Sequence, residues 1–211
     1  SLIHTPVAGG IESISFSEDG TRMLAAGGDT AVLFDTSNWQ HLVTLTDTGY
    51  VESADLSPDG TRIVTAGSYG LELWNAESGD FILRYAIPRN PYPGIDESGD
   101  HNVAFSPDGA LVLAGFADGK ARLWETENEV ILQTFEHLHC VTSVVFSPDG
   151  SMILTAGRYE ENDQQGRAYA TTKLWERDSG QILRTFVSRG IYSAGVFSVG
   201  FAANGRTVVT S

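Results

Sequence analysis

The chain has 211 residues, of which 41% are hydrophobic and 10% aromatic. That composition excludes a disordered tail and is sufficient for a sizeable core. The 27 acidic residues outnumber the 13 Lys and Arg, and the net charge of -14 argues against nucleic acid and anionic membrane surfaces as partners.

Two further features concern the compartment. The longest apolar runs are strand-length, well short of the roughly 20 residues that a membrane helix needs. Cys140 is the only cysteine, so no intrachain disulfide can form, and we expect a reducing, cytoplasmic environment. The sequence starts at Ser1 without a signal-peptide pattern, and we expect it to be part of a larger chain.

A five-residue phrase of the form Phe-Ser-Pro-Asp-Gly recurs along the chain. It occupies residues 16–20, 56–60, 105–109 and 146–150 with small changes, and a degraded copy occupies 201–205. Internal periods of roughly 20 to 50 residues indicate stacked supersecondary units. The sequence therefore predicts a repeat architecture.

Each unit contains four predicted strands in chain order. Strands a and b flank the phrase, as in 141–146 and 152–156, because Pro fixes the first turn position and Gly accepts a positive φ. Strand c carries an aliphatic–aromatic pair, as in 120–124, and strand d follows a polar turn, as in 131–135. One such sheet cannot bury both faces alone, so the copies must stack.

These markers also give the unit boundaries. Residues 2–5 align with strand d of a preceding unit, and 207–211 align with strand b of a fifth unit. The expected fold is all-β: a single β-propeller region over 1–211, with four full blades of four antiparallel strands and partial terminal blades. The predicted units are residues 1–6, 7–46, 47–86, 87–136, 137–187 and 188–211.

The strand-c pairs 33–34, 73–74, 123–124 and 174–175 make the repeats resemble those of WD-repeat β-propellers, in which strand c ends in Trp-Asp. The resemblance covers nearly the whole chain. It implies a fragment of a ring that most often has seven blades. It also implies a hydrogen-bonded network in each blade, formed by a His before strand a, a Ser or Thr on strand b, an Asp in the b–c turn and the Trp.

The chain departs from that network in most units. Only His137 holds the implied His position, and only Asp118 matches the turn Asp well. Counted from the turn glycines, the strand-b position falls on Ala26, Ala66, Ala114 and Ala156, with Thr65 and Thr155 one residue earlier. No unit is expected to hold the whole network, and Trp74, Trp124 and Trp175 are expected to pack between blades.

Three insertions interrupt an otherwise strict spacing. One lengthens the b–c loop over 158–171, and two lengthen d–a connections over 87–101 and 187–194. In a meandering blade these connections share one face, and loops on one face of a repeat scaffold usually bind partners. The residues expected to bind are Arg89, Tyr92, Asp96, Arg158, Tyr159, Arg167, Tyr169, Arg189 and Tyr192. The alternative is that exposed loops lengthen by neutral drift.

Catalytic and metal chemistry find little support in the sequence. Residues 137–140, His-Leu-His-Cys, contain zinc-type ligands, but the further ligands of a closed site are scattered over other repeats. The acidic residues of 96–100 and 160–163 lack the spacing of a calcium loop. No nucleophile elbow and no phosphate-binding glycine loop occur, so we expect no cofactor and no metal.

The sequence thus predicts a non-catalytic interaction scaffold or sensor module. Its partner is expected to be a protein or peptide, with a basic surface that complements the acidic chain. One alternative is a propeller enzyme with its active site in the central channel, although the predicted inner strands carry mostly Ser, Val, Ala and Phe. Another is self-association through exposed blade edges.

Overall fold

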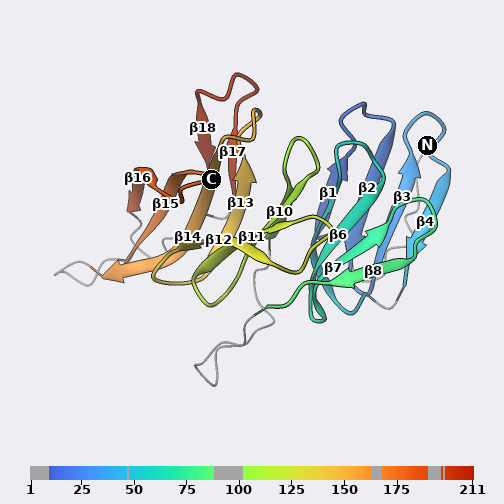
Figure 1. The fold of residues 1–211 in the computed structure, drawn as a ribbon, viewed down its shortest axis with the longest axis horizontal. Coiled ribbons are helices and arrows are strands. Elements are labelled where there is room, and N and C mark those ends of the chain that lie inside the picture. The colour runs from blue at the N-terminus through green and yellow to red at the C-terminus, as the bar shows by residue number, and fades with distance from the viewer. Residues whose placement is uncertain (1–9, 47, 88–101, 163–167, 190–195, 197) are drawn as a thin grey trace.

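The computed structural model describes residues 10–46, 48–87, 102–162, 168–189, 196 and 198–211 (Figure 1). Within these ranges the fold is all-β, with four four-stranded antiparallel sheets and one two-stranded sheet. The predicted fold class is confirmed. This part of the chain contains no helix that is long and apolar enough to cross a membrane. The strand predicted at 2–5 lies outside the described residues.

Each four-stranded sheet is one blade, with its strands side by side in chain order. Blade 1 comprises β1 (Ser13–Phe16), β2 (Arg22–Gly27), β3 (Thr30–Asp35) and β4 (His41–Leu45). Blade 2 comprises β5 (Val51–Leu56), β6 (Arg62–Gly67), β7 (Gly70–Asn75) and β8 (Phe81–Arg84). Blade 3 comprises β9 (Asn102–Phe105), β10 (Leu111–Gly115), β11 (Lys120–Glu125) and β12 (Ile131–Glu136). Blade 4 comprises β13 (Val141–Phe146), β14 (Met152–Asn162), β15 (Ala168–Glu176) and β16 (Ile182–Arg189). The two-stranded unit pairs β17 (Val199–Phe201) with β18 (Val208–Thr210).

The insertion in blade 4 extends the sheet. β14 continues to Asn162, and Glu161 and Asn162 pair with Tyr169 and Ala168 of β15. The expectation of a loop over 158–171 is therefore wrong for most of its length. A register shift between Gly157 and Glu161 lets the ladder resume, and the aromatic and β-branched residues at 169–172 favour strand. In Figure 1 the far end of β14 lies on the opposite side from the a–b turns.

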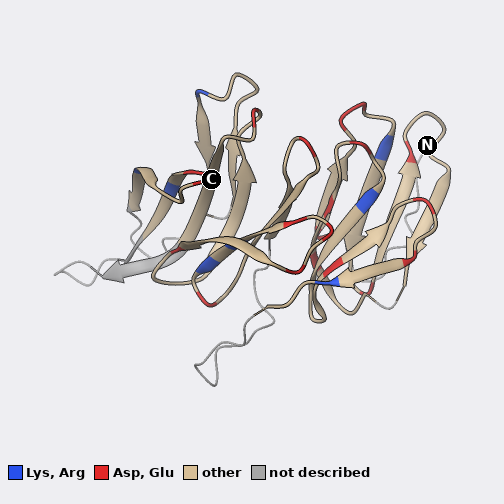
Figure 2. Ribbon diagram, in the orientation of Figure 1, with Lys and Arg blue, Asp and Glu red and all other residues tan. Residues whose placement is uncertain are grey.

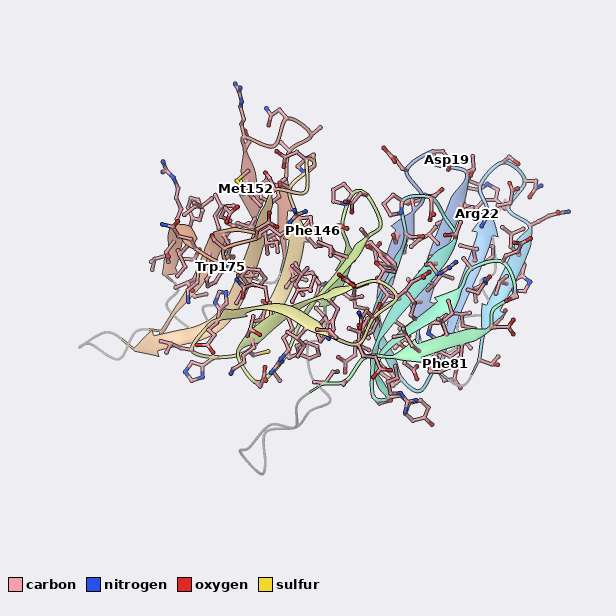
Figure 3. All side chains as sticks on the ribbon, viewed as in Figure 1. Asp19, Arg22, Phe81, Phe146, Met152 and Trp175 are labelled. Atoms are coloured by element: carbon pink, nitrogen blue, oxygen red, sulfur yellow. The ribbon has the colours of Figure 1, made fainter. Side chains whose placement is uncertain are left out.

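The recurring phrase forms the a–b turn of each blade. In blade 2, Ser57 Oγ donates to Asp59 Oδ1 at 2.7 Å and accepts from the Arg62 amide at 2.9 Å, while Gly60 has a φ of 70°. The same bonds recur in the three other full copies, and in blade 1 Asp19 lies at the upper edge of the sheet (Figure 3). Hydrogen bonds from the neighbouring Thr21 and Ser17 lower the pKa of Asp19 to about 2.

The aliphatic–aromatic pair of strand c marks a β-bulge. A register shift lies between Leu73 and Trp74 where β7 pairs with β8, and the same shift recurs at the equivalent pair of every other blade. The bulge places Trp74 opposite Phe81, with ring centroids 5.5 Å apart. A bulge conserved in all four blades explains why the spacing from the strand-c aromatic to strand d does not vary.

The strand-c tryptophans fill the interfaces between blades, as predicted. Trp74, Trp124 and Trp175 are all buried. Trp74 packs with Leu24 and Leu33 of blade 1, and Trp175 packs with Leu113 and Leu123 of blade 3. In Figure 3 the labelled Trp175 and Phe146 belong to this second cluster. Burial of such large apolar side chains is the main stabilising contribution in stacked sheets.

Blade 4 holds three members of the network that the family resemblance implies. Trp175 Nε1 donates to Thr155 Oγ1 at 2.7 Å, and His137 Nε2 lies 2.6 Å from the same hydroxyl. In blade 2, Trp74 Nε1 donates likewise to Thr65 Oγ1 at 2.9 Å. The assignment of the strand-b position to Ala66 and Ala156 is therefore wrong by one residue. An offset of one moves a strand side chain to the opposite face, and only the threonines face the Trp.

The assignment of that position to Ala26 in blade 1 carries the same offset. Met23 pairs with Phe34, so the residue two positions further along β2, on the face of Phe34, is Ala25. Ala26 packs on the other side, in the cluster shared with blade 2. Blade 1 thus has neither the hydroxyl nor the indole of this network.

Blade 3 lacks the hydrogen bond from the strand-c Trp to a strand-b hydroxyl. The residue equivalent to Thr65 is Ala114, and Trp124 Nε1 is buried without a hydrogen-bond partner. Asp118, the residue that matched the turn Asp, accepts from the Lys120 amide at 3.0 Å and forms a buried ion pair with Arg122. Asp118 therefore stabilises its own turn and neutralises the charge of Arg122.

The inner strands of successive blades are joined by side chains. Leu56 N donates to Ser15 Oγ at 3.2 Å, and Phe105 N donates to Asp55 Oδ2 at 2.8 Å. The next two steps run from Val144 N to Asn102 Oδ1 at 3.0 Å and from Val199 N to Ser143 Oγ at 3.2 Å. A small polar residue on each strand a thus accepts from the backbone of the following strand a. These bonds lock the blades to one another.

Over the described residues the stack of blades does not close into a ring, and the face of blade 1 that points away from blade 2 is incompletely covered. Phe16 of β1 is 53% exposed, whereas the equivalent residues Leu56, Phe105 and Phe146 are 2%, 6% and 6% exposed. In blades 2 to 4 the preceding blade buries this position. Figure 1 accordingly shows an open arc from blade 1 to the β17–β18 unit.

Candidate interaction face

The structure brings some of the predicted binding residues together. Arg158 and Tyr159 lie on β14, Tyr169 lies on β15, and Arg189 lies on β16. Tyr169 and Arg189 are directly opposite each other in the pairing of β15 with β16. The five others lie outside the described residues: Arg89, Tyr92, Asp96, Arg167 and Tyr192. The predicted binding role itself remains a prediction.

At the end of the blades that carries the b–c and d–a connections, two short connections have exposed tyrosines. Neither tyrosine was among the predicted binding residues. Tyr50 lies in the d–a connection that enters blade 2, and Tyr69 lies in the b–c turn of blade 2. Their exposed fractions are 50% and 49%. The Tyr50 amide donates to Ser68 Oγ at 2.8 Å, and the Ser68 amide donates to the Tyr50 carbonyl at 2.9 Å. This reciprocal pair of bonds fixes one turn against the other.

The ring of Tyr69 is held on both sides. A Cβ on Gly49 would lie 3.0 Å from Cγ of Tyr69, so only glycine, here with a φ of 63°, lets the backbone approach the ring so closely. The Arg84 guanidinium lies 5.8 Å from the ring centroid. Arg84 is itself fixed, because its Nε and Nη2 donate to the buried Glu72 carboxylate at 3.0 and 2.6 Å.

Tyr50 lies among negative charges. Its hydroxyl donates to Glu12 Oε1 at 3.1 Å. This bond, the charge of Glu12 and the charge of Glu52 raise the pKa of the Tyr50 phenol above its ordinary value. The phenol therefore stays neutral at physiological pH and presents an exposed ring beside two carboxylates.

Spacing alone could not identify these tyrosines. The predicted binding residues all lie in the three insertions, whereas Tyr50 and Tyr69 occupy connections of ordinary length. A usable signal was present, because both are large aromatics in turns, where small polar residues are usual. Aromatic residues held in rigid turns have a low ordering cost on binding and are enriched at interface hot spots.

On the opposite face, most of the described charged groups around one groove are paired within the chain. An open groove of about 470 Å³ lies there between the a–b turns of blades 2 and 3. Asp59 and Asp108 in its wall accept hydrogen bonds from Ser57 and Ser106 of their own turns, and Arg62 is paired with Glu127 at 2.8 Å. Figure 2 shows how acidic residues outnumber basic ones across both faces. The groove offers no exposed aromatic anchor among its lining residues.

The inner strands offer their polar groups mainly to neighbouring blades. Ser13 donates to the Ala54 carbonyl at 2.9 Å, and Ser15, Ser53, Asp55 and Asn102 accept from the next inner strand. Within the described ranges, no three His, Cys, Asp or Glu side chains come close enough to hold a metal ion. The hydrogen bonds give these inner-strand residues a structural role between neighbouring blades.

The comparisons with known proteins agree with the repeat. A family model for the eukaryotic translation initiation factor eIF2A matches residues 80–184. The chain is 24% identical over 86 residues to WD repeat and SOCS box-containing protein 1 of Xenopus tropicalis. It is 46% identical over 55 residues to an uncharacterised WD repeat-containing protein of Synechocystis, and 30% identical over 96 residues to apoptotic protease-activating factor 1 of Homo sapiens.

Each match covers a part of both proteins. The three alignments span 40%, 25% and 41% of this chain, and only 18%, 16% and 7% of the respective relatives. The likeness therefore concerns the repeats. Whatever else the relatives contain lies beyond the shared region.

Proposed function

We propose that this chain, a member of the WD-repeat β-propeller family, is a non-catalytic scaffold that binds a protein or peptide on the face of its b–c and d–a connections. WD-repeat relatives are typically protein-interaction scaffolds, which supports the general role. The choice of face is supported by this chain's own geometry. We further propose a cytoplasmic location, on the grounds of the single cysteine.

The observation that carries the proposal is the fixed pair of half-exposed tyrosines at 50 and 69. Large aromatic side chains that remain exposed in a folded protein are candidates for contact with a partner. These two are immobilised by backbone and ring contacts within the chain before any partner arrives. A partner that packs on them therefore meets little cost of ordering this surface.

The surrounding scaffold supports the same role. The hydrogen bonds between inner strands fix each blade relative to the next, and Arg22 Nη1 donates to the Gly60 carbonyl at 2.7 Å between neighbouring a–b turns. The extended hairpin of β14 and β15, with Tyr169 opposite Arg189, adds a projecting edge at the same end of blade 4. A scaffold whose blades are fixed to one another in this way holds binding residues in place better than free loops do.

The test uses peptides selected from a displayed random library on the wild-type chain. A double Tyr50→Ala and Tyr69→Ala variant is expected to weaken binding of the selected peptides at least tenfold, because two hot-spot rings are lost. The matched control is Phe81→Ala, which removes an aromatic of 49% exposure from the first position of β8, next to the c–d turn at the opposite end of the blade. Binding is measured by fluorescence polarisation, and unfolding midpoints confirm that the variants fold.

Equal affinity of the double variant and the wild type for every selected peptide would overturn the assignment of this face. A loss with Phe81→Ala and none with the double variant would move the binding surface to the opposite face.

A further inference from the structure

β16 is the longest outer strand of the four blades. Each sheet has its strand d at the outer end of the strand order (Figure 1). The outer strands β4, β8 and β12 have five, four and six residues, whereas β16 has eight. The extra length depends on the insertion of blade 4, because Ser188 and Arg189 pair with Ala170 and Tyr169 of the lengthened β15. Blades 1 to 3 have no pairs at these positions.

The outer edge of β16 has backbone groups that point away from the sheet. Phe186 and Tyr85 lie at the same distance in sequence from the strand-c Trp of their blades, and the Tyr85 amide donates inward to the Leu71 carbonyl at 2.9 Å. Because alternate residues of a strand direct their backbone groups to opposite edges, those of Thr185 and Val187 point away from β15. A row of such groups is a template for pairing with a further strand.

This edge lacks the features by which proteins usually protect an outer strand, which are shortness, Pro, Lys and inward charges. Residues 181–189 contain no Pro, Lys, Asp or Glu. In β12 the amide of Thr134, which is equivalent to Thr185, is already bonded to Gln133 Oε1 at 3.2 Å. Within the described residues the Thr185 amide has no such side-chain partner. Two aliphatic side chains of β16, Leu183 and Val187, are 45% and 55% exposed.

The charge of β16 differs from that of the chain. The chain has a net charge of -14, whereas residues 181–189 contain two Arg and no acidic residue. Arg184 is exposed, and no ion pair holds it within the described part of the chain. Arg84 on β8 is, by contrast, paired with Glu72 at 2.6 Å. An exposed cation on an apolar edge fits a segment that brings a carboxylate.

From these features we infer that β16 is the edge to which an extended, acidic segment of another protein adds as a further strand of blade 4. The main chain of the segment forms the hydrogen-bonded ladder, its aliphatic side chains pack beside Leu183 and Val187, and an Asp or Glu pairs with Arg184. A second copy of this chain fits less well, because two chains of charge -14 repel each other. The inference goes beyond the proposed function, since it concerns the outer edge of a blade and not the tyrosine-bearing face.

The probe is a strand-length, fluorescein-labelled peptide that alternates Val with Thr and has Glu at its centre. We expect saturable binding to the wild-type chain in fluorescence polarisation. N-methylation of the peptide amides along both edges should weaken binding at least about tenfold, because the ladder loses its donors. Methylation along one edge leaves the other edge free and should retain binding. A Lys in place of the central Glu should weaken binding about threefold.

Substitutions in the chain assign the binding to β16. Thr185→Pro removes an outward amide, a change that edge strands tolerate, and is expected to weaken probe binding about tenfold. The matched control is Thr134→Pro, the same change at the equivalent position of β12, and it is expected to have no effect. Arg184→Glu leaves every backbone group in place and is expected to reverse the preference from the Glu probe to the Lys probe. This variant keeps the inference testable if Thr185→Pro fails to fold.

Three results would overturn the inference. Equal binding of the probe methylated along both edges, or equal losses with Thr185→Pro and Thr134→Pro, would reject strand addition at β16. An unchanged Glu preference in Arg184→Glu would reject the acidic segment. A dimer in sedimentation velocity that Thr185→Pro abolishes, together with no binding of the probe, would assign the edge to a second copy.

A further variant separates this inference from the proposed function. The double variant Tyr50→Ala and Tyr69→Ala is expected to bind the strand probe as the wild type does, because the tyrosines lie in connections of blade 2. Weakening of the strand probe by this double variant would place the probe on the tyrosine-bearing face and would reject β16 as its site.

Discussion

Replacement of Asp55 by Ala is expected to lower the free energy of unfolding by about 3 kcal/mol, the largest effect of any single substitution considered. The Asp55 carboxylate on the inner strand of blade 2 joins three blades. It accepts from the hydroxyl of Ser15 in blade 1, from its own neighbour Leu56 at 2.9 Å and from the Phe105 amide of blade 3 at 2.8 Å. Alanine would leave buried donors on both sides without this acceptor.

The burial of Asp55 limits the size of that loss. Desolvation raises the pKa of its carboxyl group, which means that the charge is costly where it lies. Removal of the charge recovers part of that cost, whereas Asp55→Asn keeps one acceptor oxygen and nearly the same volume. We therefore expect Asn to cost about 1 kcal/mol. Urea unfolding of the two variants measures the difference, and equal stability of Asp55→Ala and wild type would disprove the bridging role.

Thr155→Val is expected to cost about 2 to 3 kcal/mol, although valine has almost the shape of threonine. The hydroxyl serves two buried partners, Trp175 Nε1 at 2.7 Å and His137 Nε2 at 2.6 Å. Loss of the hydroxyl deprives the indole N–H of its acceptor and breaks the contact with the imidazole. The expected result is a lower urea midpoint without a change in the secondary-structure signal.

Blade 2 supplies the matched control for this substitution. Thr65 Oγ1 accepts from Trp74 Nε1 at 2.9 Å. Thr65→Val is therefore expected to cost about 1 to 2 kcal/mol, less than Thr155→Val. Blade 3 already has alanine at this position, and the Trp124 N–H is unpaired there. If Thr65→Val proved as costly as Thr155→Val, the contact with His137 would have no energetic weight.

Turn chemistry and periodicity were sufficient to predict the blades. The strand predicted at 141–146 coincides with β13, and the strands predicted at 120–124 and 131–135 end one residue before β11 and β12. The reason is physical: a Pro-Asp-Gly turn and a buried aromatic at fixed spacing each tolerate few alternatives. The predicted pattern at 207–211 likewise appears as β18.

Side-chain partners were harder to predict than strands. In blades 2 and 4 the strand-b position was predicted at Ala66 and Ala156, one residue beyond the threonines that bond the Trp. A single-residue offset reverses the direction of a strand side chain, so the predicted residues lie on the wrong face. The insertion of blade 4 was expected as loop, although its aromatic and β-branched residues favour an extended hairpin. Asp118 was predicted to belong to the hydrogen-bonded network of its blade. In the structure its carboxylate instead forms an ion pair with Arg122, four residues further along the same hairpin.

The exposed tyrosines Tyr50 and Tyr69 could not be predicted for a different reason. Their fixed positions come from contacts between two connections that are distant in sequence from each other, such as Tyr50 with Ser68. No local pattern encodes that contact. It follows only once the d–a connection of one blade is placed beside the b–c turn of the next.

The most direct test of the account is a hydrogen–deuterium exchange footprint of the chain with a selected peptide. We predict slowed exchange in the connections around Gly28, Tyr50, Tyr69 and Leu138, which share the end of the blades opposite the a–b turns. The four a–b turns should exchange as they do in the free chain. Protection confined to those a–b turns would contradict the central claim that the partner binds the tyrosine-bearing face.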